Sequence, residues 1–102
     1  MGETEMSRRI FISGPVSGLD YNQACAAFFK AEAMIRERGD TPVTPVRICS
    51  AEWPWKKCMR TCLKALADCD GIYMLQGWRK SRGAKLEHFN ALKLGMTIET
   101  EK

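Results

Sequence analysis

Short apolar segments alternate with longer polar stretches in which apolar residues recur every three or four positions. The apolar segments have the length of buried strands and predict strands at Arg9–Ser13, Pro42–Pro45, Ile72–Leu75 and Met96–Ile98. The periodic stretches predict amphipathic helices at Asn22–Arg38, Trp55–Asp68 and Ala84–Leu94. Strands and helices that alternate in this way favour an α/β fold: a three-layer α/β/α domain around a short parallel sheet of four to five strands, flavodoxin-like or Rossmann-like.

The residues between these segments predict where the elements end. Asn22 is the expected N-cap of the first helix, and Gly39 fits the position just past its end. Pro42 and Pro45 place the second strand at a sheet edge or mark its ends, because proline cannot donate a ladder hydrogen bond. Residues 46–54 are expected to form a connecting loop.

The composition is that of a small globular domain. The chain has 102 residues, 45% of them hydrophobic, and we predict a disordered polar tail over residues 1–8 and a single domain over residues 9–98. No apolar run approaches the ~18 residues of a membrane span, and the first residues lack the apolar core of a signal peptide. We therefore expect a cytoplasmic protein without membrane contact. A net charge of +4 suits an anionic small molecule and falls short of a nucleic-acid-binding arm.

The cysteines suggest neither a disulfide framework nor a metal site. Their number, five, is odd, and no secretory signal accompanies them. Cys58 and Cys62 would share a helix face, with His88 as the only histidine available to join them. A zinc site normally uses recognisable paired spacings, so we expect reduced, buried thiols, no metal and no cofactor.

The segment Gly77–Glu87, which joins the third strand to the third helix, carries most of the candidate chemistry. It contains a serine, a glycine and several cations ahead of a carboxylate, namely Arg79, Lys80, Ser81, Arg82, Gly83, Lys85 and Glu87. Such a crossing lies at the carboxyl end of a strand, where a helix N-terminus attracts anions. The segment Ser13–Gly18 should open at the same edge, so the two segments are predicted to face one pocket. Glu87 is then a candidate nucleophile; a surface carboxylate that suits a helix start is the alternative.

Three stretches carry a resemblance to a known family: Ile10–Gly18, Leu66–Leu75 and Gly77–Ala91. On these residues the chain resembles the nucleoside 2-deoxyribosyltransferase-like superfamily, and within it a branch of small single-domain proteins (DUF4406-like). The resemblance implies cleavage or transfer at the N-glycosidic bond of 2′-deoxyribonucleosides or their 5′-monophosphates. In such enzymes the glutamate matching Glu87 attacks the anomeric carbon. The covalent glutamyl-deoxyribosyl intermediate then passes to another base (a nucleoside 2-deoxyribosyltransferase) or to water (an N-hydrolase). The resemblance also implies a homo-oligomer, a dimer or larger.

The resemblance further implies that Ser81 contacts a 5′-phosphate, which favours a 2′-deoxynucleoside 5′-phosphate N-hydrolase over a nucleoside transferase. The remaining substrate-binding candidates lie near the strand ends, namely Ser13, Gly14, Pro15, Gly18, Asp70, Trp78 and Gly83. Several have structural alternatives. Ser81 can be an N-cap, the Gly14-Pro15 turn a tight strand exit, Asp70 a backbone anchor and Trp78 a packing residue.

Two positions depart from the pattern of the catalytic relatives. Phe11 stands where they carry a tyrosine, and Cys62 stands where they carry an aspartate that assists the leaving base. Loss of such acid assistance typically costs ~10²–10⁴-fold in rate. A catalytically weak or inactive nucleotide-binding module is therefore an alternative function. A second alternative is a small protein-interaction domain that uses a basic helix face, Lys56, Lys57, Arg60 and Lys64.

Overall fold

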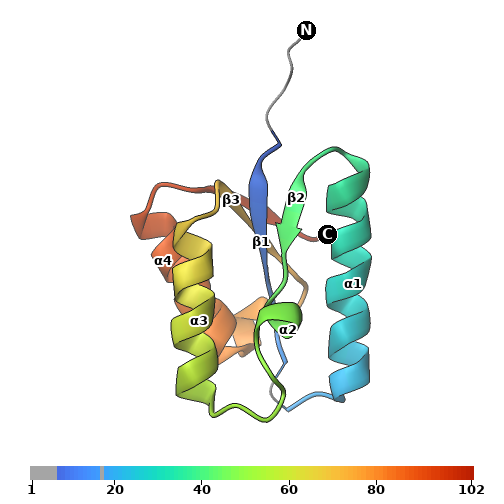
Figure 1. Ribbon diagram of the computed structural model, residues 1–102, viewed down its shortest axis with the longest axis vertical. Helices are drawn as coiled ribbons and strands as arrows, with labels where there is room; N and C mark the ends of the chain where they lie inside the picture. Colours follow the sequence, from blue (N-terminus) through green and yellow to red (C-terminus); the bar gives the residue numbers. More distant parts are fainter. Residues whose placement is uncertain (1–6, 17) are drawn as a thin grey trace, which may run out of the picture.

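The computed structural model describes residues 7–16 and 18–102 (Figure 1), so most of the predicted tail and Ser17 of the first loop lie outside the described residues. The elements in chain order are β1 (Arg9–Ser13), α1 (Tyr21–Glu37), β2 (Thr41–Val43), α2 (Pro45–Ile48), α3 (Trp55–Ala67), β3 (Gly71–Met74), the 3₁₀ helix η1 (Trp78–Lys80), α4 (Arg82–Lys93) and β4 (Thr97–Thr100). The alternation of strands and helices predicted from the sequence pattern is confirmed.

The strands form one four-stranded parallel sheet in the order β2-β1-β3-β4. β2 is an edge strand, which explains how Pro42 lies within it without interrupting a second ladder. The chain crosses from β1 to β2 on one side and continues through β3 and β4 on the other, so the strand order reverses between β1 and β3. In open α/β sheets, this switch point is where the carboxyl ends of the strands leave room for a ligand.

Helices cover both faces of the sheet, as predicted (Figure 1). Ile10 and Ile12 of β1 pack with Phe28 and Ile35 of α1 on one face. Phe11, which points the opposite way in the alternating strand, belongs to the second core with residues of α3 and α4. Within the described residues, no helix is both long enough and apolar enough to cross a membrane.

Two local predictions were wrong. The N-cap of α1 is Asp20 and not Asn22: the helix begins at Tyr21, and the Asp20 carboxylate accepts a hydrogen bond of 3.1 Å from the N–H of Gln23. The predicted loop over residues 46–54 contains most of the single-turn helix α2. A proline at its first position suits a helix start, but four residues are too few for a hydrophobic period to show.

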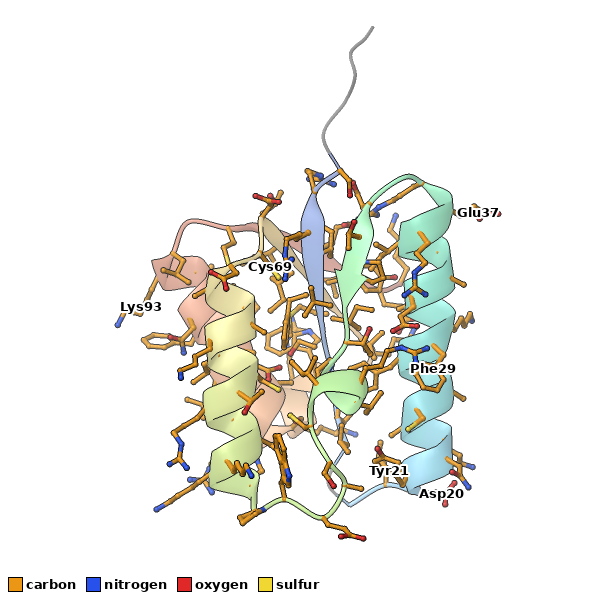
Figure 2. All side chains as sticks on the ribbon, viewed as in Figure 1. Asp20, Tyr21, Phe29, Glu37, Cys69 and Lys93 are labelled. Carbon is orange, nitrogen blue, oxygen red and sulfur yellow. The ribbon has the colours of Figure 1, made fainter. Side chains whose placement is uncertain are left out.

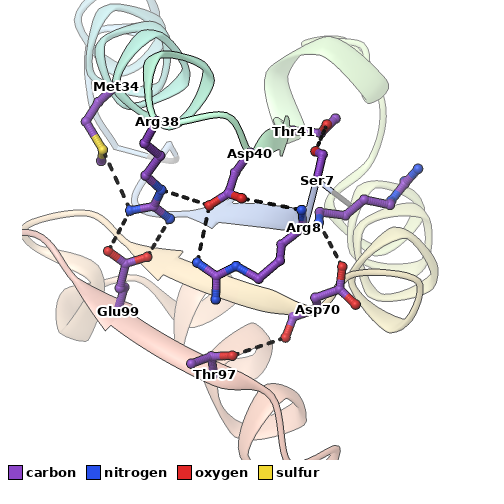
Figure 3. A network of polar contacts seen from close by, with 10 residues as sticks. Ser7, Arg8, Met34, Arg38, Asp40, Thr41, Asp70, Thr97 and Glu99 are labelled. Carbon is purple, nitrogen blue, oxygen red and sulfur yellow. Dashed lines mark hydrogen bonds and ion pairs between the residues drawn. The ribbon is translucent and has the colours of Figure 1, made fainter. Parts of the chain in front are cut away.

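A polar network fastens the end of the sheet where β1 begins (Figure 3). Arg38, just after α1, contacts Glu99 of β4 at 2.7 Å and Asp40 at 2.9 Å, and Asp40 also pairs with Arg8. Asp70 accepts a hydrogen bond of 2.8 Å from the N–H of Arg9. Arg8, Asp40 and Asp70 precede their strands, so this part of the network lies at the amino end of the parallel strands, opposite the switch-point opening.

Candidate active site

A cavity of about 720 Å³ lies at the carboxyl edge of the sheet. Gly14, Val16 and Gly18, which follow β1, line it together with Ser81 and Glu87. The prediction that the first loop and the crossing into the last helix face one pocket is therefore confirmed. Cavities of this size are typical of small-molecule sites.

Glu87 is buried, with an exposed fraction of 5%, and lines the cavity as its only carboxylate among the described residues. The Ser13 hydroxyl, at the end of β1, donates a hydrogen bond of 2.5 Å to Glu87 Oε1. Burial raises the pKa of Glu87 to about 7, although the hydrogen bond from Ser13 acts in the opposite direction. At neutral pH both the ionised and the protonated forms of Glu87 are therefore populated.

The sequence of α4 explains why a carboxylate reaches this position. Ala84, Glu87 and Ala91 lie three and four residues apart and form the buried stripe of the helix. The two alanines have short side chains, which lets α4 approach the sheet, where Ser13 ends β1. The interpretation of Glu87 as a surface residue at a helix start is wrong.

Ser81 is both the N-cap of α4 and a lining residue of the cavity. Its Oγ accepts a hydrogen bond of 3.1 Å from the N–H of Ala84. The N–H groups of Arg82 and Gly83 precede the first intrahelical hydrogen bond, so they remain available to an anion at the positive end of the helix dipole. The Arg82 guanidinium lies 4.2 Å from the Trp55 ring centroid, which places a cation at the same rim.

Gly83 has a packing role that the sequence did not reveal. A Cβ at this position would lie 3.1 Å from the sulfur of Met59 on α3. The glycine therefore lets α4 pack closely against α3. The predicted glycine on the other side of the cavity, Gly14, is similarly crowded, since a Cβ there would lie 2.8 Å from the Leu75 side chain.

The wall opposite β1 comes from the α2–α3 region, which sequence reasoning largely missed. It contributes apolar, aromatic and thiol side chains: Pro45, Val46, Cys49, Trp53, Trp55, Cys58, Met59 and Cys62. Trp53 and Trp55 both line the cavity, so this pair of tryptophans was the feature of the sequence that could have indicated the wall. Cys62 is buried, and desolvation together with the nearby Glu87 charge raises its pKa, so the thiol is protonated at neutral pH.

Four predicted site residues do not line the cavity, and one of them, Ser13, acts on it only through its hydrogen bond to Glu87. Asp70 lies in the network at the opposite end of the strands, where it anchors the backbone of Arg9 (Figure 3). Trp78 belongs to the core beneath α4 and stacks on His88, with ring centroids 4.3 Å apart. Pro15 packs near Gly77: a Cβ added at Gly77 would lie 3.6 Å from the proline ring.

Among the described residues, no three histidine, cysteine or carboxylate side chains are grouped so that they could hold a metal ion. The chemistry available at the cavity is that of one buried carboxylate, a hydroxyl that orients it and a positively charged rim. This combination suits nucleophilic attack by Glu87 on a substrate that also carries an anion.

Comparison with known proteins gives a family and a fold. Residues 8–100 match the family described as "Domain of unknown function (DUF4406)". No curated protein matches the chain significantly. Among solved structures, the chain is similar to a 2-desoxiribosyltransferase from Leishmania mexicana, with a TM-score of 0.69 and 19% sequence identity over 91% of this chain. The match spans 63% of that protein's length. At this identity, the likeness establishes the deoxyribosyltransferase-like fold.

Proposed function

This chain belongs to the DUF4406 family, and we propose that it cleaves or transfers at the N-glycosidic bond of 2′-deoxyribonucleosides or their 5′-monophosphates. The observation that carries the proposal is the Ser13–Glu87 pair, in which a buried carboxylate on a cavity wall is held by a hydroxyl from the end of β1. A carboxylate in this setting is costly for folding, which argues for a chemical role.

In the proposed reaction, an oxygen of ionised Glu87 forms a bond to C1′ of the sugar while the bond from C1′ to the base nitrogen breaks. The base leaves with the electron pair and takes up a proton. Water, or a nitrogen of a second base, then attacks C1′ and releases the carboxylate. This double displacement splits one difficult step into two easier ones, and the carboxylate also stabilises the oxocarbenium-like transition state.

The rim near Ser81 supports a 5′-monophosphate as the preferred substrate. The N–H groups that open α4, the Ser81 hydroxyl and the cation Arg82 gather at one side of the cavity. A phosphate dianion gains from each of these groups, because charge-assisted hydrogen bonds and the helix dipole act together. We therefore favour a 2′-deoxynucleoside 5′-phosphate N-hydrolase over a transferase of free nucleosides.

A nucleotide-binding module with little or no turnover is the second candidate, and Cys62 favours it. The raised pKa of this thiol makes it a poor proton donor to a departing base. Phe11, buried in the core, adds no hydroxyl near Glu87. The leaving base would then depend on solvent for its proton.

We also propose that the protein forms a homo-oligomer through the outer face of α4. Three apolar side chains of α4, together with that of its C-cap residue, are exposed in the single chain, namely Leu86, Phe89, Leu92 and Leu94. A second copy is the occupant that we propose, because an apolar helix face can pair with itself about a twofold axis. Light scattering after size-exclusion chromatography tests this: Leu92→Glu should yield a monomer, and a monomeric parent protein would refute the proposal.

The function is tested by incubating the protein with a panel of ribo- and deoxyribonucleosides and their 5′-monophosphates, and measuring free base by mass spectrometry. Glu87→Gln is the matched variant, since its amide oxygen can still accept the hydrogen bond from Ser13. We expect base release by the parent and none by the variant. Equal turnover by both proteins would exclude Glu87 as nucleophile. A nucleotide that raises the melting temperature of both proteins without being consumed would identify the binding module.

A further inference from the structure

The wall formed by α2 and α3 carries a pair of thiols that the proposed reaction does not use. Cys49, the C-cap of α2, and Cys62, on α3, both line the cavity, and their Sγ atoms are 3.6 Å apart. A disulfide bond has an S–S length of about 2.05 Å. We propose that Cys49 and Cys62 are a modification site, at which a small-molecule disulfide oxidises the two thiols to a reversible disulfide in the cavity wall.

The positions of the other cysteines single out this pair. Cys58 also lies near Cys49, but its thiol contacts the carbonyl oxygen of Ser50 at 3.9 Å, whereas the sulfurs of Cys49 and Cys62 contact each other at 3.6 Å. Cys69 donates to the carbonyl oxygen of Ala65 and lies at the end of the molecule away from Tyr21, a cavity residue (Figure 2).

The backbone around Cys49 allows the sulfurs to close the remaining gap. Cys49 has an extended conformation, with φ −122° and ψ 145°, at the start of the segment that links the single-turn helix α2 to α3. Its own N–H bonds to the carbonyl oxygen of Pro45 at 3.0 Å and not to a strand, so a small shift of the connecting segment breaks no backbone hydrogen bond of Cys49 to the sheet. Cys62, within the 13-residue helix α3, is the fixed partner.

The chemistry proceeds by two exchanges. The sulfur of Cys49, which is the less buried of the two residues, loses its proton and attacks one sulfur of the small disulfide, and a small thiolate leaves and is protonated. Cys62 then loses its proton and attacks Cys49 Sγ in this mixed disulfide. The bond between Cys49 Sγ and the small molecule breaks, and the second small thiolate leaves and is protonated. Two protein thiols are oxidised, and one small disulfide is reduced to two thiols. Burial raises the pKa of both cysteines, so the rate of oxidation should increase with pH.

The disulfide would change the surroundings of Glu87. It removes the proton of Cys62, a thiol that lines the same cavity. It also draws the segment after α2, which carries Cys49, toward α3. The loss of base release that we expect after oxidation rests on the proposed function. Formation of the bond does not, because it is measured without any substrate.

The experiment equilibrates the full chain at pH 8 with mixtures of oxidised and reduced glutathione, blocks free thiols, and maps the linked peptides by mass spectrometry. We expect a Cys49–Cys62 link that dithiothreitol reverses. Cys49→Ser and Cys62→Ser should each abolish the loss of two hydrogens from the intact mass, whereas Cys58→Ser, the matched control on the same wall, should retain it. A link from Cys49 to Cys58, glutathione adducts without an internal link, or no oxidation of the parent protein would each overturn the proposal. The peptide map of the parent decides the matter even where a variant fails to fold.

Discussion

The buried carboxylate of Glu87 should make the stability of the protein depend on pH in an unusual direction. Its pKa lies at about 7 in the folded protein against 4.5 for the free side chain, chiefly because burial penalises the charge. The folded state therefore holds this proton more tightly than the unfolded state. This tighter binding of the Glu87 proton stabilises the folded protein. The stabilisation is fully present below pH 4.5 and is lost as the pH rises through 7.

The size of the effect follows from the two pKa values. At about 1.4 kcal/mol per pKa unit, the difference between 4.5 and about 7 is worth about 3 kcal/mol. Glu87→Gln removes the titration while preserving shape and the acceptor for Ser13. We expect the variant to match the parent protein near pH 4.5 and to exceed its free energy of unfolding by about 3 kcal/mol at pH 8. This is a large part of the ~5–15 kcal/mol typical of domains.

Urea unfolding followed by tryptophan fluorescence measures the effect at several pH values between 4.5 and 8. Carboxylates that titrate identically in both proteins cancel in the difference between them. Glu37→Gln is the matched control, because Glu37 is exposed at the end of α1 and points away from the protein (Figure 2). A difference between parent and Glu87→Gln that stays constant with pH would refute the reasoning, as would a variant that is less stable at pH 8.

Further predictions concern the reaction and the turn after β1. Because Glu87 must be ionised to attack, kcat/KM for base release should rise with pH through about 7, and a profile that falls there would contradict the nucleophile role. Ser13→Ala removes the hydrogen bond that lowers the Glu87 pKa, so this rise should move to higher pH by about one unit. Ser81→Asp keeps a good N-cap but adds charge, so turnover of monophosphates should fall at least ~10-fold relative to free nucleosides; unchanged selectivity would place the phosphate elsewhere. Gly14→Ala should cost ~1–3 kcal/mol in urea unfolding, because its Cβ meets Leu75 at 2.8 Å, and a neutral effect would show that the turn relaxes freely.

The sequence was sufficient to predict the layers and the edge at which the cavity lies. Apolar runs and helical periods identified the strands, and the parallel order followed from their alternation with helices. Because the carboxyl ends of parallel strands lie at the same end of a sheet, the loop after β1 and the start of α4 were expected close together, and Ser13 and Glu87 meet there. Asp70 did not belong to that group, because it precedes its strand and so lies at the amino end.

Residues whose role depends on packing were harder to predict. α2 has too few residues for a hydrophobic period, so the sequence predicts a connecting loop over residues 46–54, the part of the wall that contains Val46, Cys49 and Trp53. Trp78 comes shortly after β3, but the turn of η1 directs it into the core. Glu32 is a polar residue on the inner face of α1 that no pattern singled out, and only the structure shows that Thr44 and Arg47 satisfy it.

The role of Glu87 is tested most directly by trapping its ester with the sugar. The protein is mixed with a 2′-deoxynucleoside 5′-monophosphate, quenched in acid within the first turnovers, digested and analysed by mass spectrometry. We predict a deoxyribosyl phosphate attached to the peptide that contains Glu87, and none in Glu87→Gln. Base release by the parent protein with no adduct at Glu87, or with an adduct on another residue, would contradict the account.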